Sequence, residues 1–339
     1  DISVSDPVEI TMGWDDCNDI SLDKIFSRME RYFYLPKTKK EIIENLDIYI
    51  EDVSRMCSLY YKIKNHDRLD FNDQVSIPRD RHNERNIIRL DKEYDVSLHT
   101  IKDILDNTGI REKEHILFLP NMVCDEEYPT TSDYGLTRDI LRTLRDINPA
   151  CKISICVGPS IFFDRRRVLE KSEIIDTASA YEARIVDIHS SELYRVNMKD
   201  SYIGSLYLPD VVFESDYLFN SSLLKKNIDA GFTGACKNLM GLLPDFEKLR
   251  FHKIGGGNHL PNAIIELYRV LKPDISVLDA RILLLGAQQK EYGGYEKEGI
   301  GIVSGTDAFH VDSYALELCG DVLGVLPIRI GDSYGKKIC

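Results

Sequence analysis

The spacing of apolar residues changes near residue 85. Before that point, apolar side chains recur every three or four residues, as on one face of a helix, at Leu22, Ile25, Phe26, Met29 and Phe33. Thr38 and Glu41 have the capping-box spacing that begins a second helix. An apolar stripe follows at Ile42, Leu46, Ile50, Val53, Cys57 and Tyr60. The polar stretch Asn65–Glu84 has no sustained period and predicts a linker or surface loop. We therefore expect an N-terminal helical extension over residues 1–85.

From Ile87 onward, short apolar runs alternate with amphipathic stretches. The runs predict strands at Ile87–Leu90, His115–Leu119, Ile153–Val157, Arg184–Ile188, Ile275–Leu278 and Ile300–Val303, with further extended segments at Ser205–Leu208 and Val211–Phe213. The amphipathic stretches predict helices at Ser97–Asn107, Leu136–Ile147, Leu260–Leu271 and His310–Leu318. This alternation indicates an α/β domain over residues 86–339, built on a mainly parallel sheet with helices on both faces. Such sheets bind ligands at the carboxyl ends of their strands.

Charge and composition exclude several classes of protein. The 339 residues include 43 Lys+Arg and 56 Asp+Glu, for a net charge of -13. This acidity argues against a nucleic acid or an anionic membrane as a partner held by bulk charge. No apolar run approaches the roughly 18 residues of a membrane span. The N-terminal stretch lacks the basic region and apolar core of a signal peptide, so we expect a cytoplasmic protein.

The nucleotide and metal motifs of common enzymes are incomplete or missing. Eight cysteines include no C-x-x-C pair, so we expect no iron–sulfur cluster and interpret the cysteines as buried small side chains. Gly255–Asn258 lacks the Lys-Ser/Thr of a phosphate loop, and Gly299–Gly301 does not complete a dinucleotide fingerprint. We therefore expect no NAD. Neither H-E-x-x-H nor G-x-S-x-G occurs, which disfavours a zincin or a serine hydrolase.

Polar residues follow three predicted strands. They are Asn121 with Thr130 and Thr131, Asp279 with Arg281, and the segment Ser304–Asp307. If the three strand ends meet at the carboxyl edge of one sheet, these side chains line a ligand site. The alternative interpretation is that Asn, Thr and Asp at strand ends cap helices and turns.

The segment Gly231–Gly241 is the richest in candidate chemistry. Small residues around Thr233 and Lys237 permit close approach to a ligand, and Lys225 precedes them. The two lysines could neutralise a carboxylate or phosphate, and a desolvated lysine can act as a base or nucleophile. His252 and His259 follow as candidates for proton transfer or metal binding. The alternative is a solvated lysine face with two surface histidines.

These patterns give three sets of candidate residues. The candidate catalytic residues are Lys237, His252, Lys225 and His259. The candidate substrate-binding residues are Asn121, Thr130, Thr131, Thr233 and Asn238. The candidate ligands of a divalent metal, the one cofactor these residues suggest, are Asp279, Asp307, His310 and Asp312. For Asp307, capping of the following helix is an equal alternative.

Four ordered blocks resemble the family called domain of unknown function 362. They are Leu117–Val123 with Thr130 and Thr131, Gly234–Pro244 with Arg250–His252, Val277–Ala280, and Gly305–Asp307 with Val311 and Asp312. The resemblance covers Ile87 to Gly324. The chain departs from the family at Leu119, which replaces a lysine, at Asn227, which replaces a histidine, and in lacking a ferredoxin-like cysteine motif. The family is distantly similar to the nickel-pincer lactate racemase group, which implies an α/β enzyme that handles a small carboxylate.

Together, the residues and the resemblance suggest an enzyme of biosynthesis that acts on a small anionic metabolite. The substrate would be an amino acid, a hydroxy acid or a specialised-metabolite precursor, transformed by acid–base or metal-assisted chemistry. An isomerase, lyase or transferase is favoured over an NAD-dependent oxidoreductase. The alternative is a non-catalytic binding or assembly module derived from such an enzyme. Besides the small-molecule substrate, the possible partners are a second copy of the chain, as a homodimer, or another protein.

Overall fold

The computed structural model describes residues 72–74 and 87–325, apart from residues 162, 164, 187, 189–190, 199–200, 202, 228 and 254–259. The helical extension expected over residues 1–85 lies outside the described residues, except for one short strand. All described helices and strands belong to one compact unit, formed by Phe71–Lys290 and Gly294–Cys339.

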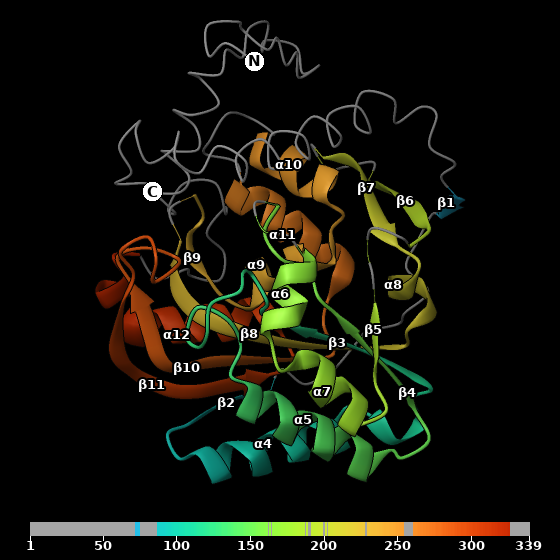
Figure 1. Ribbon diagram of the computed structural model, residues 1–339, viewed down its shortest axis with the longest axis horizontal. Helices are drawn as coiled ribbons and strands as arrows, with labels where there is room; N and C mark the ends of the chain where they lie inside the picture. The colour runs from blue at the N-terminus through green and yellow to red at the C-terminus, as the bar shows by residue number, and fades with distance from the viewer. Residues whose placement is uncertain are drawn as a thin grey trace, which may run out of the picture. The chain divides into compact units, whose positions relative to one another are not determined.

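The described part of the chain alternates strands and helices (Figure 1). Its strands are β1 (Asn72–Gln74), β2 (Ile88–Asp91), β3 (His115–Pro120), β4 (Lys152–Cys156), β5 (Arg184–Val186), β6 (Leu193–Met198), β7 (Gly204–Pro209), β8 (Tyr217–Asn227), β9 (Gly231–Thr233), β10 (Ile275–Leu285) and β11 (Tyr295–Gly305). Its helices are α4 (Tyr94–Asn107), η2 (Ile110–Glu112), α5 (Tyr134–Ile147), α6 (Arg165–Lys171), α7 (Ile174–Ala180), α8 (Val211–Glu214), α9 (Ala235–Asn238), η3 (Leu239–Leu242), α10 (Asp245–Lys253), α11 (Leu260–Leu271) and α12 (Ala308–Leu323).

The central sheet has eight strands among the described residues, in the order β2-β11-β10-β8-β3-β4-β5, with β9 paired to β8. β3, β4, β5, β8 and β10 pair in parallel. β11 runs antiparallel to both of its neighbours, β2 and β10, and β9 runs antiparallel to β8. The expected mainly parallel sheet is therefore confirmed. Strand β8, in the middle of the sheet, is absent from the expected set of strands.

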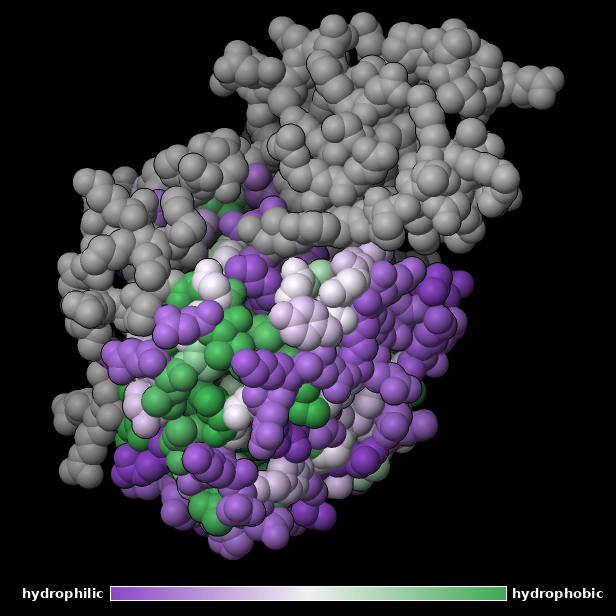
Figure 2. Space-filling view, turned by 90° about the vertical axis from the view of Figure 1, so that its left-hand side faces the viewer, coloured by the Kyte–Doolittle hydropathy of each residue, from purple (hydrophilic) through white to green (hydrophobic). Residues whose placement is uncertain are grey.

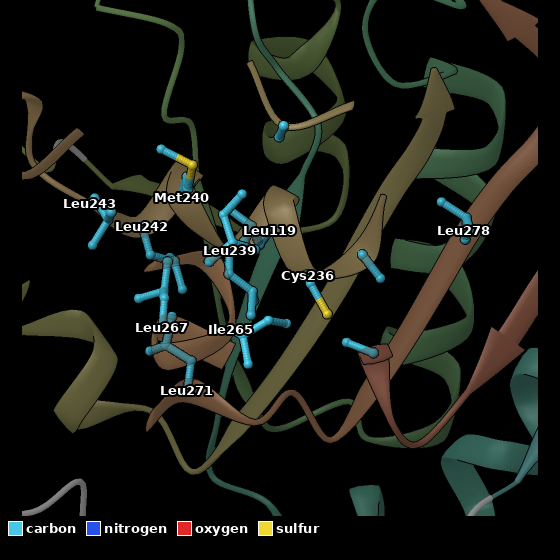
Figure 3. Close-up of a cluster of buried hydrophobic side chains, with 14 of the residues drawn as sticks. Leu119, Cys236, Leu239, Met240, Leu242, Leu243, Ile265, Leu267, Leu271 and Leu278 are labelled. Atoms are coloured by element: carbon cyan, nitrogen blue, oxygen red, sulfur yellow. The ribbon is translucent and has the colours of Figure 1, made fainter. Parts of the chain in front are cut away.

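Helices cover both faces of this sheet, as expected (Figure 1). Side chains alternate along β3, so Ile116 and Phe118 join one apolar layer and Leu117 and Leu119 join the other. Apolar faces of α4, α5 and α7 complete the first layer. Residues of α9, η3, α11 and α12 complete the second, part of which is shown in Figure 3. Burying each large apolar side chain stabilises the fold by roughly 1.5–3 kcal/mol.

The described residues also form a second sheet of three strands, in the order β1-β6-β7. Its strand β1 falls within Asn65–Glu84, so the expectation of a loop was wrong for these three residues. Val211–Phe213, expected to be extended, instead lies in helix α8, because the Asp210 carboxylate accepts a hydrogen bond from the Val211 amide at 2.7 Å and begins the helix.

One surface of the molecule gathers apolar side chains (Figure 2). On α12, Tyr314, Leu318 and Val322 are exposed and lie four residues apart, on one face of the helix. Among the described residues, every helix is too short or too polar to cross a lipid bilayer.

Candidate active site

Two of the three polar strand ends meet at the carboxyl edge of the parallel strands. Asn121 follows β3, whose Pro120 lies opposite Ser221 of β8, and Asp279 lies opposite Leu223 of the same strand. The third, Ser304–Asp307, is at the opposite edge, because β11 is antiparallel and its Gly305 lies beside Ser276, near the start of β10. The expectation that all three converge was therefore wrong for this segment.

Lys225 is buried at this edge, with only 2% of its surface exposed. Its ammonium donates to the side-chain oxygen of Asn121 at 3.2 Å and to the carbonyl oxygen of Thr130. Burial, together with the positive charge of Lys237, lowers the pKa of Lys225 to about 8, although Cys124 and Glu126 oppose the shift. Lys225 is thus a cation that loses its proton only slightly above neutral pH.

A chain of three buried amides begins at this lysine. Asn121 Nδ2 donates to Asn238 Oδ1 at 2.8 Å, and Asn238 Nδ2 donates to Asn220 Oδ1 at 2.8 Å. Asn220 Nδ2 in turn donates to the carbonyl of Ala235 at 2.9 Å. Each amide points its oxygen toward Lys225, which favours the charged ammonium. Asn121 and Asn238 were expected in the site, whereas Asn220 was not, because it lies inside a strand that the sequence pattern did not reveal.

Lys237 differs from the other lysines of the site in its surroundings. It lies on the short helix α9, half-buried, and makes neither a hydrogen bond nor an ion pair with any described residue. Burial lowers its pKa, Asp229 opposes the shift, and Lys248 adds to it. Lys248 itself is buried and donates to the carbonyl of Pro159 at 2.8 Å. We call Lys225, Lys237 and Lys248 the lysine cluster.

Asp229 and His252 form an acid–base pair near Lys237. The His252 Nδ1 atom, on α10, is 3.7 Å from the Asp229 carboxylate. Burial raises the pKa of Asp229, and the charge of Lys237 opposes that rise. Asp229 and Lys248 were missed by sequence reasoning. Their only signal was proximity to the Gly231–Gly241 segment. His259 lies outside the described residues.

The threonines have structural partners. Thr130 Oγ1 donates to Glu126 Oε2 at 2.7 Å, and Thr131 Oγ1 donates to the Glu126 carbonyl at 2.6 Å. Both hydroxyls therefore stabilise the loop after β3. Thr130 contacts the site through its backbone carbonyl, which accepts from Lys225. Thr233 lies opposite Lys225 in the β8–β9 pairing, at the edge of the lysine cluster.

The fold separates Asp279 from the other three residues expected to bind a metal, whereas the His310 Nδ1 atom lies 3.1 Å from Asp307 Oδ1. Asp279 is engaged by Arg281, Asp307 caps α12 through the His310 amide at 2.9 Å, and Asp312 accepts from the amides of Ala235 and Cys236 at 2.6 and 2.9 Å. Within residues 72–74 and 87–325, where described, no three His, Cys, Asp or Glu side chains are placed to hold an ion. The residues present therefore do not fit a common metal site, because β11 carries Asp307 to the far edge of the sheet.

The family model described as Domain of unknown function (DUF362) matches residues 116–317. The chain belongs to this family. The match includes the lysine cluster, the amide chain and the Asp229–His252 pair, and it confirms the resemblance seen in the sequence blocks. Among curated proteins, none matches the DUF362 chain.

Two solved structures are distantly similar to this DUF362 protein. One is the apoprotein of lactate racemase from Thermoanaerobacterium thermosaccharolyticum, with 15% identity, a TM-score of 0.46 and coverage of 70% of this chain and 57% of that chain. The other is a protein from Thermotoga maritima, with 12% identity, a TM-score of 0.38 and coverage of 66% and 58%. The DUF362 chain thus spans less than two thirds of either structure.

Proposed function

We propose that this DUF362 protein is an enzyme that binds a small anionic metabolite at the lysine cluster and catalyses a proton transfer to or from a carbon of that metabolite. The observation that carries the proposal is the ammonium of Lys237, which is half-buried and makes no hydrogen bond or ion pair with the described residues. A partly desolvated cation without a partner is costly, and a bound anion would offset that cost.

The rest of the cluster adds to the attraction for an anion. Lys225 and Lys248 are buried, and their ammonium groups are held by carbonyl and amide oxygens. Carbonyl and amide partners leave the positive charge of Lys225 uncancelled, whereas Asp245 lies 3.6 Å from Lys248 and offsets part of its charge. Fixed positive groups of this kind stabilise the negative charge that develops when a proton leaves a carbon next to a carboxylate.

His252 supplies the proton-transfer group in this proposal. The Asp229 carboxylate lies 3.7 Å from Nδ1 and would orient the ring, as acidic partners do for catalytic histidines. Proton removal by His252 with charge stabilisation by Lys237 suits an isomerase, a lyase or a transferase. An amino or hydroxy acid is the substrate class that this chemistry favours.

Solvent exchange into carbon-bound positions tests the proposal. The protein is incubated in D₂O with a panel of amino and hydroxy acids, and deuterium incorporation is followed by proton NMR. We expect exchange in at least one acid with the native protein. Lys237→Met should abolish exchange together with anion binding, and His252→Gln should abolish exchange while leaving binding measurable by calorimetry.

The matched control is Lys226→Met. Lys226 neighbours Lys225 on β8 and donates to the Leu323 carbonyl at 2.9 Å, away from the cluster. Its removal should leave exchange unchanged. If Lys237→Met and His252→Gln both exchange at the native rate, the assignment of the site is wrong.

A further inference from the structure

Arg281 lies in a bulge of β10, beside the strand that carries Lys225. The pairing of β10 with β8 shifts between Asp279 and Leu284, which lie opposite Leu223 and Lys225. The extra residues arch out of the ladder, and Arg281 stands in this arch. No hydrogen bond or ion pair joins Arg281 to Lys225 among the described contacts, so any influence of one on the other passes through other residues.

The guanidinium of Arg281 is held on several sides. Its Nε and Nη2 donate to the two Asp279 oxygens at 2.9 and 2.6 Å, and Nη2 also donates to Asp133 Oδ2 at 2.7 Å. The rings of Tyr94 and Tyr128 lie 5.0 and 5.4 Å from its central carbon. A bidentate and stacked guanidinium has a fixed geometry that a lysine cannot reproduce.

Two of these partners belong to the loop that holds Lys225. This loop runs from Asn121 to Asp133 and supplies both acceptors of the Lys225 ammonium, Asn121 Oδ1 and the Thr130 carbonyl. Tyr128 and Asp133 lie on either side of Thr130. Tyr128 donates to Asp279 at 3.2 Å, and Asp133 binds Arg281 directly. The Thr130 carbonyl is thus fixed between two anchor points that both converge on the Arg281–Asp279 pair.

We infer that Arg281 is a positioning residue for Lys225: through Tyr128 and Asp133, the Arg281–Asp279 pair clamps the Asn121–Asp133 loop to β10 and so holds the loop oxygens against the buried ammonium. The relevance of this clamp to catalysis rests on the proposed function, but the clamp itself does not. It also explains why the Asp279 oxygens, expected to bind a metal, are occupied by protein donors.

Competitive chemical labelling of lysines tests the clamp without any substrate. The full-length protein is treated with a trace of isotopic acetic anhydride, and the labelling of each lysine is read from peptides by mass spectrometry. In the native protein, Lys225 should label slowly because it is buried. In Arg281→Gln the loop loses its anchor, and Lys225 should label at least roughly tenfold faster through local opening.

Two comparisons separate a local effect from general loosening. Lys248 is also buried, but it is held by Pro159 on a different loop, so its labelling in the Arg281→Gln protein should stay at the native level. Arg269→Gln is the matched control variant, because Arg269 is exposed on α11, pairs with Glu266 at 2.5 Å and shares no partner with Arg281 among the described residues. It should leave the labelling of both lysines unchanged.

Asp133→Asn provides an independent route if Arg281→Gln does not fold. Asparagine still caps α5, as Asp133 does through the Gly135 amide at 2.7 Å, but its bond to Arg281 loses the negative charge. We expect Lys225 labelling to rise, by less than in Arg281→Gln. Native-rate labelling of Lys225 in both variants, or an equal rise for Lys248, overturns the inference. Faster Lys225 labelling in a protein that binds no anion would sustain the clamp and refute the proposed function.

Discussion

Replacing Lys225 by methionine should remove the pH dependence that this buried lysine imposes on stability. Methionine has a similar length and no charge, so Lys225→Met removes the cost of burying an ammonium and leaves Asn121 Oδ1 and the Thr130 carbonyl without their donor. An unsatisfied buried acceptor costs about 1–3 kcal/mol. Lowering the lysine pKa from 10.5 to about 8 corresponds to roughly 3 kcal/mol against the charged form. At pH 7 the two effects nearly cancel, and the variant should be close to the native protein in stability.

The sign at higher pH follows from proton binding. Between pH 8 and 10.5 the unfolded chain keeps the Lys225 proton, whereas the folded protein has released it. The free energy of unfolding of the native protein therefore increases with rising pH. Lys225→Met lacks this gain. From pH 7 to pH 10 the native protein should therefore gain about 2.5 kcal/mol over the variant.

Urea denaturation of both proteins across this pH range measures the difference directly, because the other titrating groups cancel. Lys226→Met is the matched control. It removes a half-buried lysine from the same strand and reports the general cost of losing a lysine there. If the free energies of unfolding of the native protein and Lys225→Met change in parallel from pH 7 to pH 10, burial does not lower the pKa of Lys225 and the reasoning is refuted.

Two further predictions concern the site and its support. Binding of an anion to the lysine cluster, followed by calorimetry, should weaken as pH rises through about 8, because Lys225 then loses its positive charge; affinity that is constant to pH 10 would contradict this. Gly158→Ala should destabilise the protein by about 1–3 kcal/mol in urea denaturation, because its new Cβ would lie 1.9 Å from the Gly241 carbonyl oxygen. Ser160→Ala, in the same loop, is the control, and equal stability of the two variants would refute the contact.

The sequence pattern predicts well those elements whose burial is plain in their residues. The helix expected at Leu260–Leu271 has these bounds in the structure, because its apolar stripe and the following Pro273 mark both its face and its end. β3 and β4 were equally clear as short apolar runs. β8 was not, because the central strand carries Asn220, two serines and two lysines, whose burial depends on partners distant in sequence.

Strand direction explains the largest error in the site. Nothing in the residues of β11 shows that it runs antiparallel, yet this reversal moves Asp307 to the other edge of the sheet.

The pair Lys225 and Lys226 shows a second limit of prediction from the sequence. Side chains alternate along a strand, so Lys225 faces the Asn121–Asp133 loop and Lys226 faces the end of α12. Only the register of β8 distinguishes the two, and the register is set by neighbouring strands.

The amide chain has a polarity that neither end can reverse. At one end the Lys225 ammonium can only donate, and at the other the Ala235 carbonyl can only accept. Turning over one asparagine would set two NH₂ groups or two oxygens against each other, so the three side chains keep one shared orientation. Protonation at β8 is thereby coupled to the start of α9, the helix that carries Lys237. The hydrogen-bond path that begins at Lys225 thus ends on the helix that carries Lys237, and the two lysines also interact through their mutual repulsion.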